Sequence, residues 1–231
     1  MTDSKPAYSS MGGIMNRGHR AFYRTLRFLF SGLMKLYFRA EVHGRDHIPR
    51  TGGFILCPVH RSYIDTPVAT AITPRIMRFM GKETMWKKAG FGAWFLNCMG
   101  GFPVQRGEAD RQAIRAAEGL LKRGEPLVMF PEGTRRDGLI VQAEHMQDGA
   151  AFVSGRAQVP IVPMGIAGTD KALPRGAKFV FPRKMVFVIG PPIPPPEQVN
   201  GRVPRKAVKR HTEMLRGRIQ ELYDEALALA R

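Results

Sequence analysis

The fold is organised around one stretch of sequence, Cys57-Pro58-Val59-His60-Arg61-Ser62-Tyr63-Ile64-Asp65-Thr66-Pro67. An apolar run over 54–56 precedes it after a Gly-Gly break, and a Thr-Pro pair closes it. This order is typical of a buried strand, a loop and the start of a helix. We therefore expect His60 on a loop at a strand end, Asp65 and Thr66 at the helix N-cap, and Pro67 as the first helical residue.

The spacing of His60 and Asp65 indicates which chemistry this loop can support. On one helix the two side chains would point well over a right angle apart, but they can meet where a loop turns into a helix. A neutral imidazole can then take a proton from an attacking hydroxyl while the carboxylate orients the ring and stabilises the imidazolium. A loop histidine beside a helix cap fits the same residues, so the pair alone assigns no function.

Length and charge narrow the class of protein. The 231 residues are enough for one domain with a full core, and 36 Lys and Arg against 19 Asp and Glu give a net charge of +17. That charge predicts an anionic partner: nucleic acid, a phospholipid surface or a phosphorylated substrate. Cys57 and Cys98 belong to no CxxC or His-rich cluster, so neither a disulfide framework nor a metal site is expected. Without a secretory signal or a long uncharged apolar run, no membrane-spanning helix is expected.

The N-terminal region divides into a flexible tail, residues 1–13, and an amphipathic helix, residues 14–40. One stripe of the helix is basic and the opposite one apolar. The basic stripe holds Arg17, Arg20, Arg24, Arg27, Ser31 and Lys35, and the apolar stripe holds Phe22, Leu26, Leu29, Phe30, Leu33 and Tyr37. Such a helix can lie in a membrane interface, or its apolar side can simply cover the domain.

Short apolar strands alternate with helices from residue 41 to 231, which predicts an α/β fold with a mixed, mostly parallel sheet flanked by helices. Strands are expected near 41–44, 54–56, 76–80, 102–105, 127–130 and 159–166, and helices at 67–72, 110–122, 149–154 and 204–230. Pro160 and Pro163 favour an edge or a bulge for the strand 159–166. Residues 178–181 and 185–189 resemble a closing hairpin. The aromatic segment 85–102 fits a buried helix or the wall of an apolar groove.

Three loops that follow strands carry candidate ligands: the His60 loop, Arg106, and the segment 132–136. Ligand sites of open parallel sheets form beyond the carboxyl ends of strands, so these loops can converge on one cleft. Arginine forks bind phosphate in a bidentate way, and Gly133 and Thr134 can add backbone and hydroxyl donors. The pattern predicts a site that activates a hydroxyl on a phosphorylated molecule.

Four motifs in a fixed order resemble the glycerolipid acyltransferase family, in particular its bacterial 1-acylglycerol-3-phosphate (lysophosphatidate) acyltransferases. They are His60 to Asp65 (His-x4-Asp), Gly100 to Arg106, Phe130 to Arg135, and Val159 to Pro163. Gly81-Lys82-Glu83 is similar to a Lys-Glu step that the family often has between the first two. Together they span 52–168, and their order and spacing carry the resemblance, because single motifs of this kind are weak signals.

The resemblance implies direct acyl transfer from acyl-CoA or acyl-ACP to a lysolipid, with phosphatidate as product, no cofactor, no metal and no covalent enzyme intermediate. His60 would be the base and Asp65 its orienter. Lys82, Arg106 and Arg135 would hold the phosphate, while Glu132, Gly133 and Thr134 would shape the acceptor site. It also implies an acyltransferase domain over 41–231 and a membrane-binding helical element before it. The enzyme would sit on the cytoplasmic face of the cell membrane, peripheral or monotopic.

Alternatives remain at this point. The acceptor could be glycerol-3-phosphate, another lysolipid or an amine-bearing lipid, and acyl carrier protein would be a partner only if the donor is acyl-ACP. A non-enzymatic protein that binds nucleic acid or an anionic surface would share the charge. No aromatic and basic platform of the known nucleic-acid modules is apparent, so nucleic acid is not the expected partner.

Overall fold

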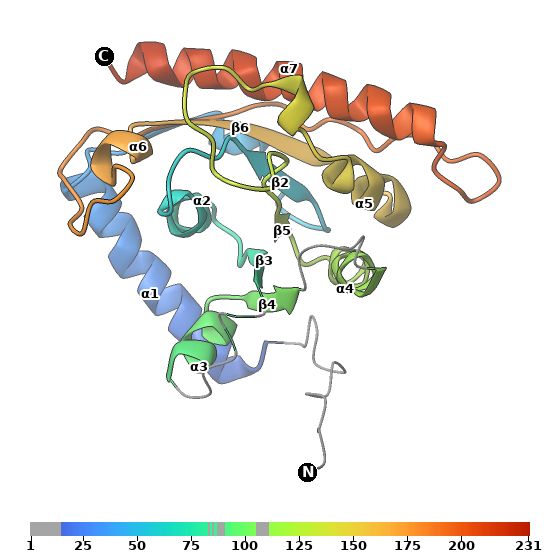
Figure 1. Ribbon diagram of the computed structural model, residues 1–231. Coiled ribbons are helices and arrows are strands. Elements are labelled where there is room, and N and C mark those ends of the chain that lie inside the picture. The colour runs from blue at the N-terminus through green and yellow to red at the C-terminus, as the bar shows by residue number, and fades with distance from the viewer. Residues whose placement is uncertain (1–14, 83, 85, 87–90, 105–110) are drawn as a thin grey trace.

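The computed structural model describes residues 15–82, 84, 86, 91–104 and 111–231, and these form a sheet covered by helices. The strands are β1 (Glu41–His43), β2 (Ile55–Pro58), β3 (Arg78–Lys82), β4 (Gly101–Val104), β5 (Leu127–Val128), β6 (Ile161–Ala167) and β7 (Val186–Ile189). They lie in the order β1-β7-β6-β2-β5-β3-β4 (Figure 1). Every neighbouring pair is parallel except β6 and β7. The predicted mixed, mostly parallel α/β sheet is confirmed.

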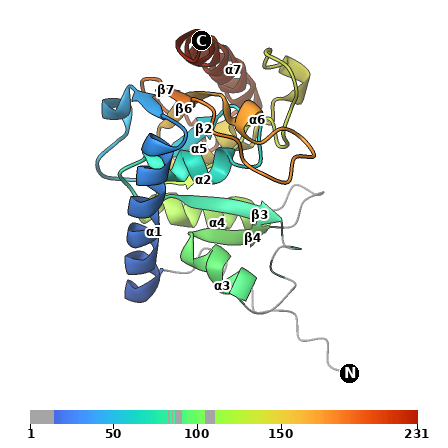
Figure 2. The same cartoon turned by 90° about the vertical axis from the view of Figure 1, so that its left-hand side faces the viewer.

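The helices cover the sheet on both sides. They are α1 (Arg17–Leu36), α2 (Asp65–Ile72), α3 (Phe91–Cys98), α4 (Arg111–Lys122), α5 (Gly149–Ala157), α6 (Thr169–Ala172) and α7 (Arg205–Leu229). In Figure 1, α1 and α2 lie on one side of the sheet and α4 and α5 on the other. α7 packs on β6 and β7 and α3 on β4, at opposite ends of the molecule (Figure 2). Because both faces are covered, β2 and β6 are buried along their whole length.

The sequence favoured an edge position or a bulge for the proline-containing strand β6. The strand instead lies between β7 and β2, with an unbroken register to each. Pro163 directs its carbonyl to the N–H of Gly190, on the β7 side. Its missing N–H would have pointed the same way, so the bonds from β6 to β2 are unaffected. The sheet therefore accommodates Pro163 in an interior strand.

The predicted hairpin of 178–181 with 185–189 is wrong in its first arm. Residues 178–185 form a loop, whereas β7 pairs with β6 on one side and with β1 on the other. Since β1 occupies the position beside β7, no edge is left there for a strand over 178–181. Phe179, Val180 and Phe181 of that loop stay exposed instead, while Met185 at its end is buried.

The amphipathic helix α1 turns a different face inward from the one its pattern suggested. Tyr23 and Met34 are buried, and two residues of the predicted basic stripe bind α2 and the turn after it: Arg27 donates to the Thr73 carbonyl and Ser31 to the Ala71 carbonyl. Several large apolar side chains remain exposed, namely Phe28, Leu29, Leu33 and Leu36. The helix thus covers the domain and also presents apolar groups outward. In the described part of the chain no helix is both long enough and apolar enough to cross a bilayer.

Candidate active site

The loop between β2 and α2 is folded around the carboxylate of Asp65. Its Oδ2 atom accepts the backbone N–H groups of Arg61 and Ser62 at 2.6 and 2.7 Å and lies 2.9 Å from Nδ1 of His60. Asp65 is fully buried. The helix begins at Asp65, two residues before the predicted start at Pro67, because this carboxylate turns back to the loop instead of capping the helix.

His60 is held in place from several directions. The contact with Asp65 requires the proton on Nδ1, which leaves the lone pair of Nε2 available as a base. The Phe130 ring stacks on the imidazole with centroids 4.0 Å apart, while the His60 backbone N–H donates to Glu132 and its carbonyl accepts from the N–H of Arg136. Both predicted catalytic residues therefore meet in the geometry of a base and its orienter.

Glu132 is buried against the His60 loop. Its side chain is only 2% exposed, and its oxygens accept from Nη1 of Arg61 at 2.7 and 2.9 Å in addition to the His60 N–H. The Arg61 guanidinium lies 5.1 Å from the Tyr223 ring of α7. Burial raises the pKa of the Tyr223 hydroxyl, although the neighbouring Arg61 cation opposes this, so the phenol stays protonated at neutral pH. Glu132 thus positions the loop in this structure.

The Arg61 to Glu132 pair was missed by sequence reasoning. The sequence does indicate that Glu132 has a cationic partner, because an acidic residue between two buried segments needs one. Arg61 follows the candidate base directly, but nothing in the sequence indicates that a residue 71 positions away is its partner.

The turn after β5 brings Gly133, Thr134 and Arg135 to the cavity that His60 lines. Gly133 has a φ of 66°, which favours glycine and turns the chain toward the cavity. The guanidinium of Arg135 lies 3.1 Å over the ring of Tyr63, a residue without a predicted role. A guanidinium stacked by its face keeps its N–H donors, which lie in its plane, available for an oxyanion.

The side chains of two predicted phosphate ligands, Lys82 and Arg106, lie outside the described part of the structure. Lys82 is the last residue of β3, at the carboxyl edge where the His60 loop also begins, but its side chain lies outside the described part. Arg106 lies outside the described residues altogether. The structure therefore brings together His60, Asp65 and the 133–135 turn, and leaves these two cations untested.

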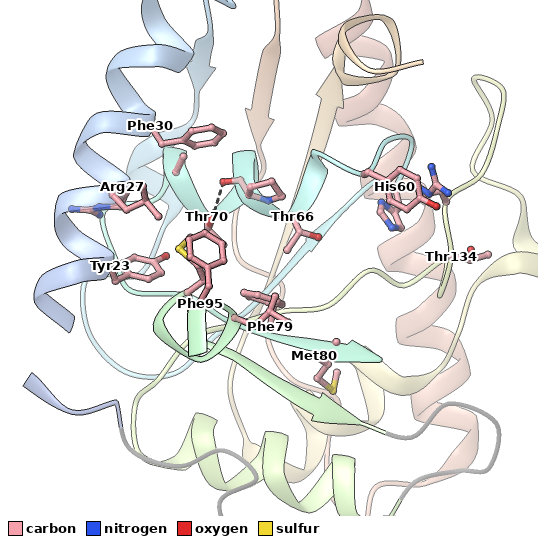
Figure 3. Close-up of a pocket in the computed structure, with 18 of the residues that line it drawn as sticks. Tyr23, Arg27, Phe30, His60, Thr66, Thr70, Phe79, Met80, Phe95 and Thr134 are labelled. Atoms are coloured by element: carbon pink, nitrogen blue, oxygen red, sulfur yellow. Dashed lines mark hydrogen bonds between the residues drawn. The ribbon is translucent and has the colours of Figure 1, made fainter. Parts of the chain in front are cut away.

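A cavity of about 710 Å³ runs from His60 to α1 and α3. In Figure 3, His60 and Thr134 lie at one side and Tyr23 and Phe30 at the other. Between them the lining is mostly apolar, with Phe79, Met80, Phe95, Leu96 and Met99. The sequence left two interpretations of the segment 85–102, a buried helix or the wall of an apolar groove. For α3 and Met99, which line the cavity, the groove wall is the correct one.

This arrangement suits an amphiphilic substrate. A base and a guanidinium stand at the polar end, and the apolar lining can hold a hydrocarbon chain out of water. Among the residues described, no group of His, Cys, Asp and Glu could hold a metal ion.

The comparisons with known proteins all match acyltransferases. Residues 39–167 match the model of a family described as Acyltransferase. A 1-acyl-sn-glycerol-3-phosphate acyltransferase of Bacillus subtilis is 27% identical over 82% of this chain and 91% of its own length. A protein of the same name from Streptococcus pneumoniae is 33% identical over 65% of this chain, and that match spans 56% of its length.

A solved structure has a similar fold. The crystal structure of the 1-acyl-sn-glycerophosphate (LPA) acyltransferase PlsC from Thermotoga maritima superposes with a TM-score of 0.68 at 24% identity. The superposition covers 93% of this chain and 86% of that one. At this identity the likeness supports the fold only.

Proposed function

The chain belongs to the acyltransferase family, and we propose that it transfers a fatty acyl group from an acyl thioester to the free hydroxyl of 1-acylglycerol-3-phosphate, giving phosphatidate. The family match confirms the resemblance that the four motifs indicated. The observation that carries the proposal is the His60 to Asp65 pair at the polar end of an apolar cavity, beside Arg135.

In the proposed reaction, Nε2 of His60 takes the proton of the acceptor hydroxyl as its oxygen attacks the thioester carbonyl carbon. Asp65 stabilises the imidazolium that forms. The tetrahedral intermediate then collapses, the carbon–sulfur bond breaks, and the departing thiolate takes the proton from His60. One ester and one free thiol result, and no bond to the enzyme forms.

Arg135 is the described cation best placed for the acceptor phosphate, because it follows Thr134 at the His60 side of the cavity, whereas Arg27 lines the cavity at the α1 side (Figure 3). Thr134 belongs to the same turn, and we assign Lys82 and Arg106 to the same phosphate on the strength of the motifs. Glu132 acts indirectly: it accepts hydrogen bonds from Arg61 and from the His60 backbone N–H and so holds the His60 loop in place. The donor is acyl-CoA or acyl-ACP, and neither a cofactor nor a metal is part of the proposal.

The acceptor is a membrane lipid, so the enzyme must work at a bilayer. We place it on the cytoplasmic face of the membrane as a peripheral or monotopic protein. The exposed apolar residues of α1, with the basic residues around them, support this position. A net charge of +17 adds attraction to anionic phospholipids.

The first test is His60→Ala, with thiol release from acyl-CoA measured after addition of lysophosphatidate. We expect the rate to fall by about 10² to 10⁴, the range of general base catalysis. Binding to lipid vesicles should be unchanged, because His60 takes no part in the surface of α1. His43→Ala, at the exposed end of β1, is the matched control and should keep wild-type activity. Wild-type transfer by His60→Ala would rule out the mechanism.

A further inference from the structure

The loop that follows α6 exposes an aromatic cluster, which we call the 178–184 loop: Lys178-Phe179-Val180-Phe181-Pro182-Arg183-Lys184. Phe179 is 77%, Val180 38% and Phe181 46% exposed. Single exposed apolar residues are ordinary, but a contiguous group of large ones indicates a contact surface. No strand uses these residues, although their composition suits a strand.

This loop is continuous with the outer surface of α1. The Tyr37 hydroxyl donates to the Val180 carbonyl at 2.9 Å, and the Met185 N–H donates to the Phe38 carbonyl. Leu33 lies one helical turn before Tyr37 and is also exposed. Figure 1 shows the loop, in orange near α6, beside the C-terminal end of α1. Two segments about 140 residues apart in sequence thus form one apolar surface.

The same loop borders the active site. The N–H of Phe181 donates to the carbonyl of Ala172 in α6, and the next carbonyl, that of Leu173, accepts from the Ser62 hydroxyl. Ser62 belongs to the turn folded around Asp65. Whatever covers the 178–184 loop therefore lies close to the loop that carries His60.

The charge around the cluster favours an anionic bilayer. Residues 171–184 contain five cations and no acidic residue, although Arg175 is paired with Asp137 at 3.0 Å. Lys178 and Arg183 flank the aromatic group and are exposed. Lys184 is paired with Glu41 at 2.9 Å. Aromatic side chains between exposed cations match the polarity of a membrane interface, with rings at headgroup level and cations near lipid phosphates.

We propose that the 178–184 loop is a second membrane contact, which inserts Phe179 and Phe181 into the interface of an anionic phospholipid bilayer. A single surface helix leaves the domain free to rotate about the helix axis, whereas a second contact fixes its orientation. The His60 loop is thereby held toward the lipid. The inference rests on the proposed function in two respects, that the acceptor is a lipid and that α1 contacts the membrane, and it assigns a role to residues outside the catalytic site.

Vesicle binding tests the contact without any enzymatic assay. Co-sedimentation of the full chain is measured with phosphatidylglycerol-containing vesicles and with pure phosphatidylcholine vesicles, for wild type and Phe179→Ser/Phe181→Ser. We expect the double variant to bind anionic vesicles about tenfold or more weakly, given the transfer free energy of two phenylalanine side chains. Met214→Ser removes a similarly exposed apolar residue (42%) from α7 and should bind like wild type. Equal binding by the double variant and wild type would overturn the proposal.

A fluorescent label locates the contact directly. Cys57 and Cys98 are both buried, and burial raises the pKa of the Cys57 thiol, so a cysteine introduced at 179 is the reactive one. An environment-sensitive label on Phe179→Cys should shift to the blue with anionic vesicles, and the same label on Met214→Cys should not. No shift at 179, or equal shifts at both, would contradict insertion. If the double variant instead changes the oligomeric state, the surface joins two copies of the chain and the proposal fails.

Activity separates this proposal from the proposed function. With a short-chain lysophosphatidate dissolved as monomers, Phe179→Ser/Phe181→Ser should turn over like wild type, and with vesicle-borne lysophosphatidate it should be slower. Loss of both rates would mean that the loop supports the active site itself, against the proposal. If wild type acylates no acceptor but vesicle binding still depends on the aromatic pair, the function is wrong and the contact stands.

Discussion

The position of His60 depends on residues from two distant motifs. Asp65 fixes the ring from its own loop, while Phe130 stacks on it and Glu132 holds its backbone from the turn after β5. If His60 is the base, as proposed, a ring held on all these sides loses little freedom on reaching the transition state, and such preorganisation lowers the barrier. The two motifs therefore act as one unit.

Tyr63 should matter for the acceptor alone, because its ring supports Arg135 and it is itself exposed. A cation–π contact at an exposed site contributes about 0.5 to 1 kcal/mol. We expect Tyr63→Ala to raise KM for lysophosphatidate by about two- to fivefold, with kcat and KM for the acyl donor unchanged. Tyr63→Phe keeps the ring and is the control. Equal effects of the two variants, or a change in the donor KM, would show that the stacking is irrelevant to the phosphate.

Residue-level prediction succeeded where the partners are close in sequence. His60 and Asp65 are five positions apart, so local geometry was enough to pair them. Arg61 and Glu132, and likewise His60 and Phe130, meet only through the pairing of β2 with β5, which brings the two loops side by side. Such contacts require the fold first.

At the scale of elements, α7 is tied to the active site through β6. Gly165 of β6 lies so close to the backbone of Leu222 that a Cβ at this position would collide with it. The next residue along α7 is Tyr223, whose ring lies beside Arg61. A shift of α7 away from the sheet would therefore also remove the ring from the Arg61 and Glu132 pair.

Two glycine substitutions with opposite expected effects on stability test this packing. Gly165→Ala forces the α7 backbone outward, and we expect it to lower the free energy of unfolding by about 1 to 3 kcal/mol, as overpacking does. Gly217→Ala, within α7 and with no atom near the added methyl group, should raise it by about 0.5 to 1 kcal/mol. Urea denaturation measures both. Unchanged stability in Gly165→Ala would mean that α7 adapts without loss.

Elements were predictable where burial alone determines them. The strands β2 and β5 and the helix over 204–230 were recognised because both sheet faces and one helix face must be buried. The loop 178–185 was not, since whether an apolar segment joins a sheet depends on a free neighbour, and β1 already takes the place beside β7. This loop, where the strand prediction failed, is also the surface for which we propose a function. Functional surfaces are where local sequence pattern and tertiary context are expected to disagree.

Over the whole molecule, charge and exposed apolar surface act together. At the proposed membrane surface, the net charge of +17 would attract the protein to anionic lipid from a distance without fixing how the protein is oriented there. In the proposed membrane contacts, the exposed side chains of α1 and of the 178–184 loop act only where they touch the bilayer. Salt separates the two contributions, because it screens charges and leaves apolar burial intact.

Vesicle binding should accordingly lose only part of its strength in salt. Raising ionic strength from about 0.1 M to about 1 M shortens the Debye length from about 10 to 3 Å, which removes most of the attraction between exposed charges. Wild type should keep a salt-resistant fraction on phosphatidylglycerol vesicles, and Leu33→Ser/Leu36→Ser, which removes exposed apolar groups from α1 but leaves the 178–184 loop, should keep a clearly smaller one. Phosphatidylcholine vesicles are the control, and binding to them should be weak and independent of salt. If salt releases wild type and the variant to the same extent, the exposed apolar side chains of α1 do not enter the interface.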